Sequence, residues 1–301
     1  MNEKTINTHR LMRIAAIYSV VTAFILIAIK FYAWFMTDSV SVLSSLIDSI
    51  SDITISAINL FAINYALTPP DDDHRFGHNS AEDIAALFQS AFIFGSYLFI
   101  TLSAINKFYN PTEIDSSNIG MIVMLISIVL TISLVSFQKY VVSKTGSTAI
   151  EADSMHYLGD IVANLAVILA LYASTNLGWK YADPIFAICI SIYMFIGSYK
   201  IGKIALDKLM DKEMPEKEIK KLHDIITNHE GSMGYHNLKT RYSGVKAFIQ
   251  LHLDLQHNLS LLDAHTITDK LEHKIRAEFP ESEVIIHQDP FDEASGEHID
   301  H

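Results

Sequence analysis

The chain contains a single cysteine, Cys189, among its 301 residues, and only 19% of its residues are charged. One cysteine excludes a small secreted domain held together by disulfides. Hydrophobic residues make up 50% of the chain, which excludes a disordered acidic protein. The 22 Lys and Arg against 34 Asp and Glu give a net charge of −12 and a pI near 5.5. This acidity argues against nucleic-acid binding, because a phosphate backbone favours a basic surface.

Charge and histidine are distributed unevenly along the chain. Residues 1–210 contain 12 Lys and Arg, 16 Asp and Glu, and 4 His, whereas residues 211–301 contain 10, 18 and 10 of these. The last part therefore carries −8 of the −12 and most of the histidine. The pattern predicts a short N-terminal segment at 1–10, a transmembrane domain at 11–210, a metal-binding domain at 211–291 and a disordered tail at 292–301.

Long uncharged runs recur throughout the first 210 residues. A bilayer core requires about 20 mostly apolar helical residues, so we expect six transmembrane helices near 11–36, 39–66, 81–108, 118–142, 148–175 and 182–207. The first apolar run is long and lacks a small-residue cleavage site, so we do not expect a cleaved signal peptide. Cytoplasmic loops carry an excess of Lys and Arg. Here the side that holds both termini collects Lys4, Arg10, Arg13, Arg75, Lys139, Lys144, Lys203 and Lys208. We therefore expect both termini in the cytoplasm.

Beyond residue 210 the pattern changes to that of a soluble α+β domain. We expect helices over 215–228 and 260–279, and strands over 235–242, 246–256 and 283–289. The second strand alternates apolar and polar residues, which is the period of a strand with one buried face. The order αββαβ predicts two helices on one face of a three-stranded sheet.

Charged groups inside the membrane segments point to a cation site. Asp48 and Asp52 are spaced i,i+4 in the second helix, and His156 and Asp160 are spaced i,i+4 in the fifth. Ionisable residues within a membrane are costly and are usually functional. Three carboxylates and one imidazole form a suitable tetrahedral set for a divalent cation, and protons would compete for the same groups. We interpret Lys30 as a side chain that snorkels toward the membrane surface.

Two further clusters lie outside the membrane segments. Asp71, His74 and His78 in the loop near residue 75 form either a metal site or a solvated acidic loop. In the soluble domain, strand and helix pairing could bring together a second set of candidate ligands, which comprises His236, His252, His265, His287 and Asp289.

These motifs together resemble the cation diffusion facilitator family. They are the Asp-x-x-x-Asp and His-x-x-x-Asp pairs, the loop Asp-Asp-His-x-Phe-Gly-His, and the ending His-Gln-Asp-Pro. The resemblance implies a homodimer of six-helix bundles in the inner membrane, each with a cytoplasmic ferredoxin-like, metallochaperone-like domain. It also implies a transport site of Asp48, Asp52, His156 and Asp160, a loop site of Asp71, His74 and His78, and a binuclear cytoplasmic site of His236, His252, His265, His287 and Asp289.

The sequence departs from the family pattern at one position. The family loop commonly continues Gly-His-Gly-Lys, whereas this chain has Ser80 at the lysine position. The resemblance implies that this lysine pairs with an acidic residue, which here corresponds to Asp211. Ser80 cannot form that ion pair.

We expect a secondary transporter, not an enzyme, that exchanges Zn²⁺ for protons and exports it from the cytoplasm. Fe²⁺ and Cd²⁺ are further candidate substrates, and His156, Asp52 and Asp160 are the candidate proton-coupling residues. The alternative is a membrane metal sensor without flux. A metalloenzyme is disfavoured, because four protein ligands leave no open coordination position.

Overall fold

A computed structural model describes residues 3–37, 40–109, 118–177, 179, 181–292 and 297–298. The chain divides into two compact units, which are described separately. One comprises Thr8–Leu206, and the other comprises Asp207–His301 together with Met1–Asn7.

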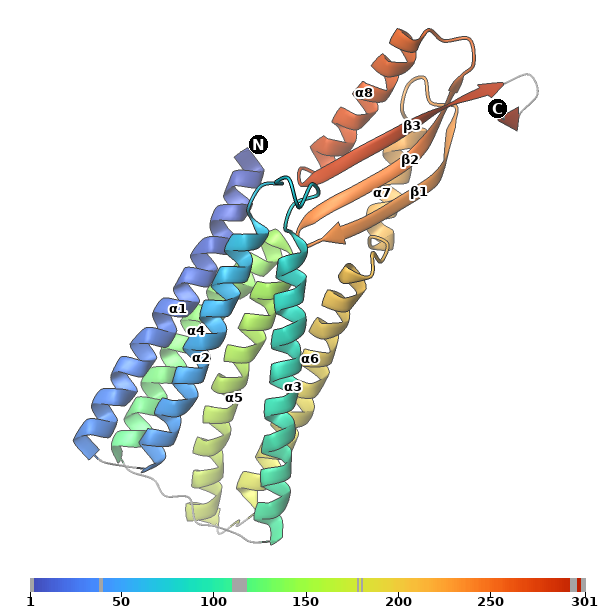
Figure 1. Cartoon of the computed structure of the whole chain (residues 1–301). Coiled ribbons are helices and arrows are strands. Elements are labelled where there is room, and N and C mark those ends of the chain that lie inside the picture. The colour runs from blue at the N-terminus through green and yellow to red at the C-terminus, as the bar shows by residue number, and fades with distance from the viewer. Residues whose placement is uncertain are drawn as a thin grey trace. The chain divides into compact units, whose positions relative to one another are not determined.

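Six long helices run alongside one another in the first part of the chain (Figure 1). They are α1 (Glu3–Thr37), α2 (Val40–Ala66), α3 (Ser80–Tyr109), α4 (Asn118–Thr145), α5 (Thr148–Leu177) and α6 (Ala182–Leu209). Each contains one of the apolar runs on which its prediction was based. Large apolar side chains remain exposed on their outer faces, including Phe24, Phe61 and Phe99. Such a surface suits lipid better than water.

Five of these helices, within the described residues, are long and apolar enough to cross a membrane. The helix outside that set is α5, whose described part carries the polar residues Asp153, His156 and Asp160. Helix α5 packs against α2, α3 and α4, so it belongs to the same bundle. Asp153, His156 and Asp160 lower the hydropathy of the described part of α5, which explains why α5 is not among the five helices.

A glycine allows α5 to approach two neighbouring helices next to Asp160. A Cβ atom placed on Gly159 would lie 2.3 Å from the Tyr97 hydroxyl of α3 and 2.7 Å from Met194 Cε of α6. A larger residue would require the Tyr97 and Met194 side chains to move. Gly159 therefore allows these two side chains to reach the α5 backbone next to Asp160.

The second unit contains α7 (Glu216–Thr227), β1 (Gly234–Ser243), β2 (Lys246–Gln256), α8 (Leu261–Glu278), β3 (Ser282–Asp292) and β4 (Glu297–His298). The sheet order is β1-β2-β3-β4, with β2 and β3 parallel and the other pairs antiparallel. A single apolar core joins the inward side chains of β2 to both helices, and it includes Leu222, Ile226, Ile249, Leu251, Leu253, Leu271 and Ile275. The predicted αββαβ order and the buried face of the second strand are confirmed.

The structure adds a fourth, two-residue strand to the three predicted strands, within the described part of the tail. Strand β4 pairs with the end of β3, with Phe291 opposite His298 and Asp292 opposite Glu297. A strand of two residues is too short to show a period in the sequence. It forms only because the end of β3 is available for pairing. The other residues of the tail beyond Asp292 lie outside the described residues.

Replacement of Leu253 by alanine is expected to destabilise the soluble unit by about 2–5 kcal/mol, the usual cost of truncating a buried leucine. Leu253 is fully buried at the centre of the core. Hydrogen exchange of the β2 amides in the full chain measures the effect. Gln250→Ala, on the exposed face of the same strand, is the control and should change exchange little. If Leu253→Ala lowers the free energy of unfolding by less than about 1 kcal/mol, this description of the core is contradicted.

Candidate metal sites

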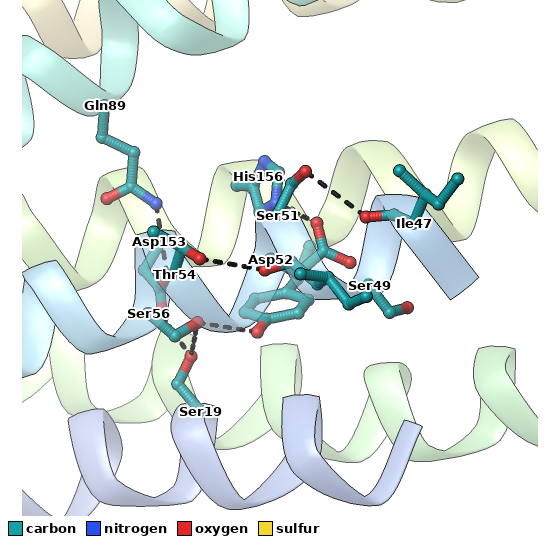
Figure 2. Close-up of polar contacts among 12 residues, drawn as sticks. Ser19, Ile47, Ser49, Ser51, Asp52, Thr54, Ser56, Gln89, Asp153 and His156 are labelled. Atoms are coloured by element: carbon teal, nitrogen blue, oxygen red, sulfur yellow. Dashed lines mark hydrogen bonds and ion pairs between the residues drawn. The ribbon is translucent and has the colours of Figure 1, made fainter. Parts of the chain in front are cut away.

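The first cluster lies inside the helical bundle and joins α2 to α5. Asp52, His156 and Asp160 each offer a ligand atom within 4.8 Å of the other two. His156 Nε2 lies 3.0 Å from Asp52 Oδ1, and both side chains are only 13% exposed (Figure 2). A tetrahedral ion with bonds of about 2.0–2.2 Å holds its ligand atoms roughly 3.3–3.6 Å apart. The Asp52–His156 distance is close to this spacing, and the ligand atom of Asp160 lies within 4.8 Å of both.

Local helix geometry explains why these residues meet. His156 and Asp160 are four residues apart, so they project from one face of α5 toward α2. The His156 ring also meets Phe92 of α3 edge-on, with centroids 6.3 Å apart. This aromatic contact limits how far the imidazole can turn away from Asp52.

Asp48, the fourth predicted ligand in the membrane, is not brought into this cluster. Its side chain is exposed, and it is not among the three residues whose ligand atoms converge. Asp48 lies one turn before Asp52 on α2. Its role as a ligand stays a prediction.

The interpretation of Lys30 as a snorkelling side chain was wrong. Its ammonium donates to Ser49 Oγ at 2.6 Å and to the Ser45 carbonyl at 3.2 Å, both on α2. Ser49 lies one turn before Asp52 on the same helix. Lys30 therefore places a positive charge beside the acidic cluster, which is a favourable position for a cation in a membrane.

The second cluster occupies the loop between α2 and α3, where Asp71, His74 and His78 converge. Asp71 Oδ1 lies 3.4 Å from His74 Nδ1, and its Oδ2 lies 3.3 Å from His78 Nε2. The His74 backbone N–H donates to Asp71 Oδ1 at 2.6 Å and holds the pKa of that carboxyl below its usual value. Thr68 Oγ1 lies 3.0 Å from His78 Nδ1, which leaves Nε2 directed at Asp71. The three side chains converge, and the choice between a metal site and a solvated acidic loop stays a prediction.

The third cluster lies across three neighbouring strands of the sheet. His236 pairs with His252 between β1 and β2, and His252 pairs with His287 between β2 and β3. Asp289 Oδ2 lies 2.7 Å from His252 Nδ1 and 3.3 Å from His236 Nε2, whereas its Oδ1 lies 3.2 Å from His287 Nε2. One carboxylate thus connects all three imidazoles, each of its oxygens facing a different side.

His265, the remaining predicted ligand, is exposed on α8 and is not part of the convergent set His236, His252 and Asp289. Two residues that contact the imidazoles of this cluster were not identified from the sequence. Asp254 Oδ1 lies 3.0 Å from His236 Nδ1, and the Asn237 side-chain amide lies 3.3 Å from His252 Nε2. Asp254 follows His252 by two residues on the same strand face, which is the pattern that could have identified it.

The described geometry can be compared with known proteins. Residues 16–210 match the family model of the cation efflux transmembrane domain, and residues 214–291 match that of the cation efflux protein cytoplasmic domain. The chain is 45% identical over 287 residues to Protein p34 of Rickettsia rickettsii, covering 95% of each chain. It is 44% identical over 281 residues to the cation-efflux pump FieF of Citrobacter koseri, covering 93% of each.

This chain belongs to the cation efflux family. As a member, the chain is a multi-pass membrane transporter of cations. The matches also confirm the family resemblance and the division into a transmembrane and a cytoplasmic part. The Asp52–His156–Asp160 cluster lies in the part that matches the cation efflux transmembrane domain, and the His236–His252–Asp289 cluster lies in the part that matches the cytoplasmic domain. The two clusters therefore lie in separately matched parts of the chain.

Asp211 has a partner within its own unit. Arg241 Nη1 of β1 lies 2.9 Å from Asp211 Oδ1, and the Arg241 guanidinium also lies over the Phe248 ring at 4.3 Å. Asp211 adopts a φ of 57° at the turn that follows α6. In this cation efflux protein, Asp211 is thus paired with an arginine of the sheet.

Proposed function

We propose that the chain exports Zn²⁺ from the cytoplasm in exchange for protons. The observation that carries this proposal is the convergence of Asp52, His156 and Asp160 within a membrane-spanning bundle. Two carboxylates and an imidazole suit Zn²⁺ and Cd²⁺ and accept Fe²⁺, whereas Mg²⁺ and Ca²⁺ prefer all-oxygen sites. Asp48 is the proposed fourth ligand, recruited when α2 moves.

Metal and protons compete for the same atoms in this cluster. A divalent cation needs the lone pair of His156 and ionised Asp52 and Asp160, and protonation of these groups removes its ligands. We assign proton coupling to these three residues. Protons arriving from the far side of the membrane would displace the metal there, and the proton gradient would drive the cycle. Rocking of the helices around this central cluster would expose it to each side in turn.

The chain is proposed to lie in the inner membrane with both termini in the cytoplasm, on the basis of its Lys and Arg distribution. We also propose that it functions as a homodimer. The similarity to a pump of Citrobacter koseri named for cation efflux supports export as the direction of transport.

The cytoplasmic cluster is proposed as a regulatory Zn²⁺ site. Asp289 offers one oxygen to His236 and His252 and the other to His287, which fits a carboxylate shared between two metal ions. Asp254 and Asn237 would orient the two imidazoles of β1 and β2. A ligand that binds only the folded domain stabilises it by mass action, so occupancy can report the cytoplasmic metal concentration. The Asp71, His74 and His78 loop is proposed as a third site.

Transport by the purified chain in sealed vesicles tests this function. With a Zn²⁺ indicator and a pH indicator inside, we expect Zn²⁺ and protons to move in opposite directions, with proton movement that requires Zn²⁺. Asp52→Ala vesicles should show neither flux. Wild-type protein that binds Zn²⁺ but transports none would instead identify a membrane metal sensor, and Asp52→Ala flux equal to wild type would place the transport site elsewhere.

A further inference from the structure

A buried carboxylate outside all three clusters lies at the centre of the bundle. Asp153 of α5 has no exposed surface. Its Oδ2 accepts hydrogen bonds from Ser19 Oγ of α1 at 2.7 Å and from Gln138 Nε2 of α4 at 2.6 Å. Its Oδ1 accepts one from Gln89 Nε2 of α3 at 3.1 Å (Figure 2). Three other helices therefore donate to a single side chain of α5.

The network continues to the remaining ligand-bearing helix. Ser19 Oγ lies 2.9 Å from Ser56 Oγ of α2 (Figure 2). Ser56 Oγ in turn lies 2.8 Å from the Tyr157 hydroxyl of α5. Ser19 and Ser56 are both buried, and Tyr157 has no exposed surface. Hydrogen bonds thus connect α1, α2, α3, α4 and α5 through groups from which water is excluded.

Asp153 is the shared acceptor of this network. Ser19 and the two glutamine amides direct their donors at its two oxygens. Gln138 turns its Nε2 to Asp153 even though its buried Oε1 then has no hydrogen-bond partner among the described residues. Leaving a buried carbonyl unpaired is costly. The hydrogen bond to Asp153 offsets that cost, as expected for a charge-assisted bond.

The position of Asp153 on α5 connects this network to the proposed transport site. Asp153 precedes His156 by three residues and Asp160 by seven, so all three lie on one face of the helix. Tyr157, the other end of the network on α5, meets the His156 ring edge-on with centroids 5.5 Å apart. The network therefore fixes the turn of α5 that carries His156, and it does so relative to α2, which carries Asp52.

We propose that Asp153 is a positioning residue for metal transport, whose carboxylate fastens α5 to α1, α3 and α4 and so sets His156 and Asp160 at ligand distance from Asp52. The proposal rests on the proposed function of that cluster. Asp153 does not itself bind the metal in this role. It acts through the placement of α5, much as an outer-shell partner orients a metal ligand.

Moving the charge to another helix tests this role. Asp153→Asn removes the charge and replaces one acceptor oxygen with a donating NH₂, so the hydrogen bonds from α1, α3 and α4 must rearrange. We expect the KM for Zn²⁺ in vesicles to rise about 10- to 100-fold, the usual cost of losing an outer-shell partner. The double variant Asp153→Asn with Gln138→Glu restores both the donor–acceptor pairing and the charge, now on α4. We expect the double variant to return the KM to within about threefold of wild type.

The two variants decide between positioning and direct metal contact. A wild-type KM in Asp153→Asn overturns the proposal. Failure of the double variant to restore KM, in protein that remains monodisperse, also overturns it, because the carboxylate would then be needed on α5 itself. If Asp153→Asn alone does not fold, recovery of folded, transporting protein by the double variant supports the proposal. Asp52→Ala in the same vesicles distinguishes failure of the positioning role from failure of the proposed function. Wild-type flux in Asp52→Ala would show that the transport site itself is wrongly assigned.

Discussion

Replacement of His156 by alanine should reduce Zn²⁺ flux by more than about 100-fold. Even the outer partners of metal ligands contribute about 10- to 100-fold to affinity, and a direct ligand should contribute more. His156 is the one imidazole of the membrane cluster and lies 3.0 Å from Asp52. Its removal leaves two carboxylates, a set that favours harder cations than Zn²⁺. Initial rates of Zn²⁺ uptake into vesicles measure the effect.

A histidine that belongs to none of the three clusters provides the control for this experiment. His273 of α8 is 73% exposed, and its Nε2 lies 3.5 Å from Asp269 one turn away. His273→Ala should transport at the wild-type rate. If His156→Ala keeps more than about a tenth of the wild-type rate, His156 is not a ligand in the rate-determining state, and the membrane site must be assigned to other residues.

The second large effect is expected at the cytoplasmic cluster. Asp289→Asn removes the charge of the one side chain that contacts His236, His252 and His287, while its size is kept. We expect the variant to bind about two fewer Zn²⁺ per chain at equilibrium, because both proposed metal positions share this carboxylate. It should also lose the stabilisation by Zn²⁺, which is about 2.7 kcal/mol when the metal is at 100 times its Kd.

Equilibrium dialysis and hydrogen exchange of the β1 and β2 amides, each with and without Zn²⁺, measure these two losses. Asp269→Asn, on the exposed face of α8, is the matched control and should retain both. Unchanged Zn²⁺ binding in Asp289→Asn would remove the shared carboxylate from the proposed cytoplasmic site.

Much of the fold could be predicted because its cause is local. The apolar runs in the first 210 residues are longer than any soluble core strand, and each appears as a helix. The alternation in β2 matches its buried residues Ile249, Leu251 and Leu253. By contrast, β4 depends on a neighbouring strand for its existence. No periodicity within the sequence encodes that pairing.

The candidate sites divide in the same way. Spacing identified His156 and Asp160, because residues four apart share a helix face whatever the helix packs against. Spacing could not show that Asp48 lies outside the cluster, since this depends on how α2 is rotated relative to α5. Spacing also could not show that Lys30 donates to Ser49, because this hydrogen bond depends on the packing of α1 against α2. Asp153 lies three residues before His156, but its partners come from three other helices, which spacing along the chain cannot show.

The alignment of His236, His252 and His287 across three strands has a consequence for how the soluble unit folds. Strands β2 and β3 are parallel and are separated in the chain by the whole of α8. Slipping this pairing by one residue would turn the imidazoles of one strand to the opposite side of the sheet. Only the native register therefore assembles the donor atoms, and a bound ion would discriminate between correct and misaligned sheets. Metal binding would then stabilise the correctly registered sheet over misaligned ones while the protein folds.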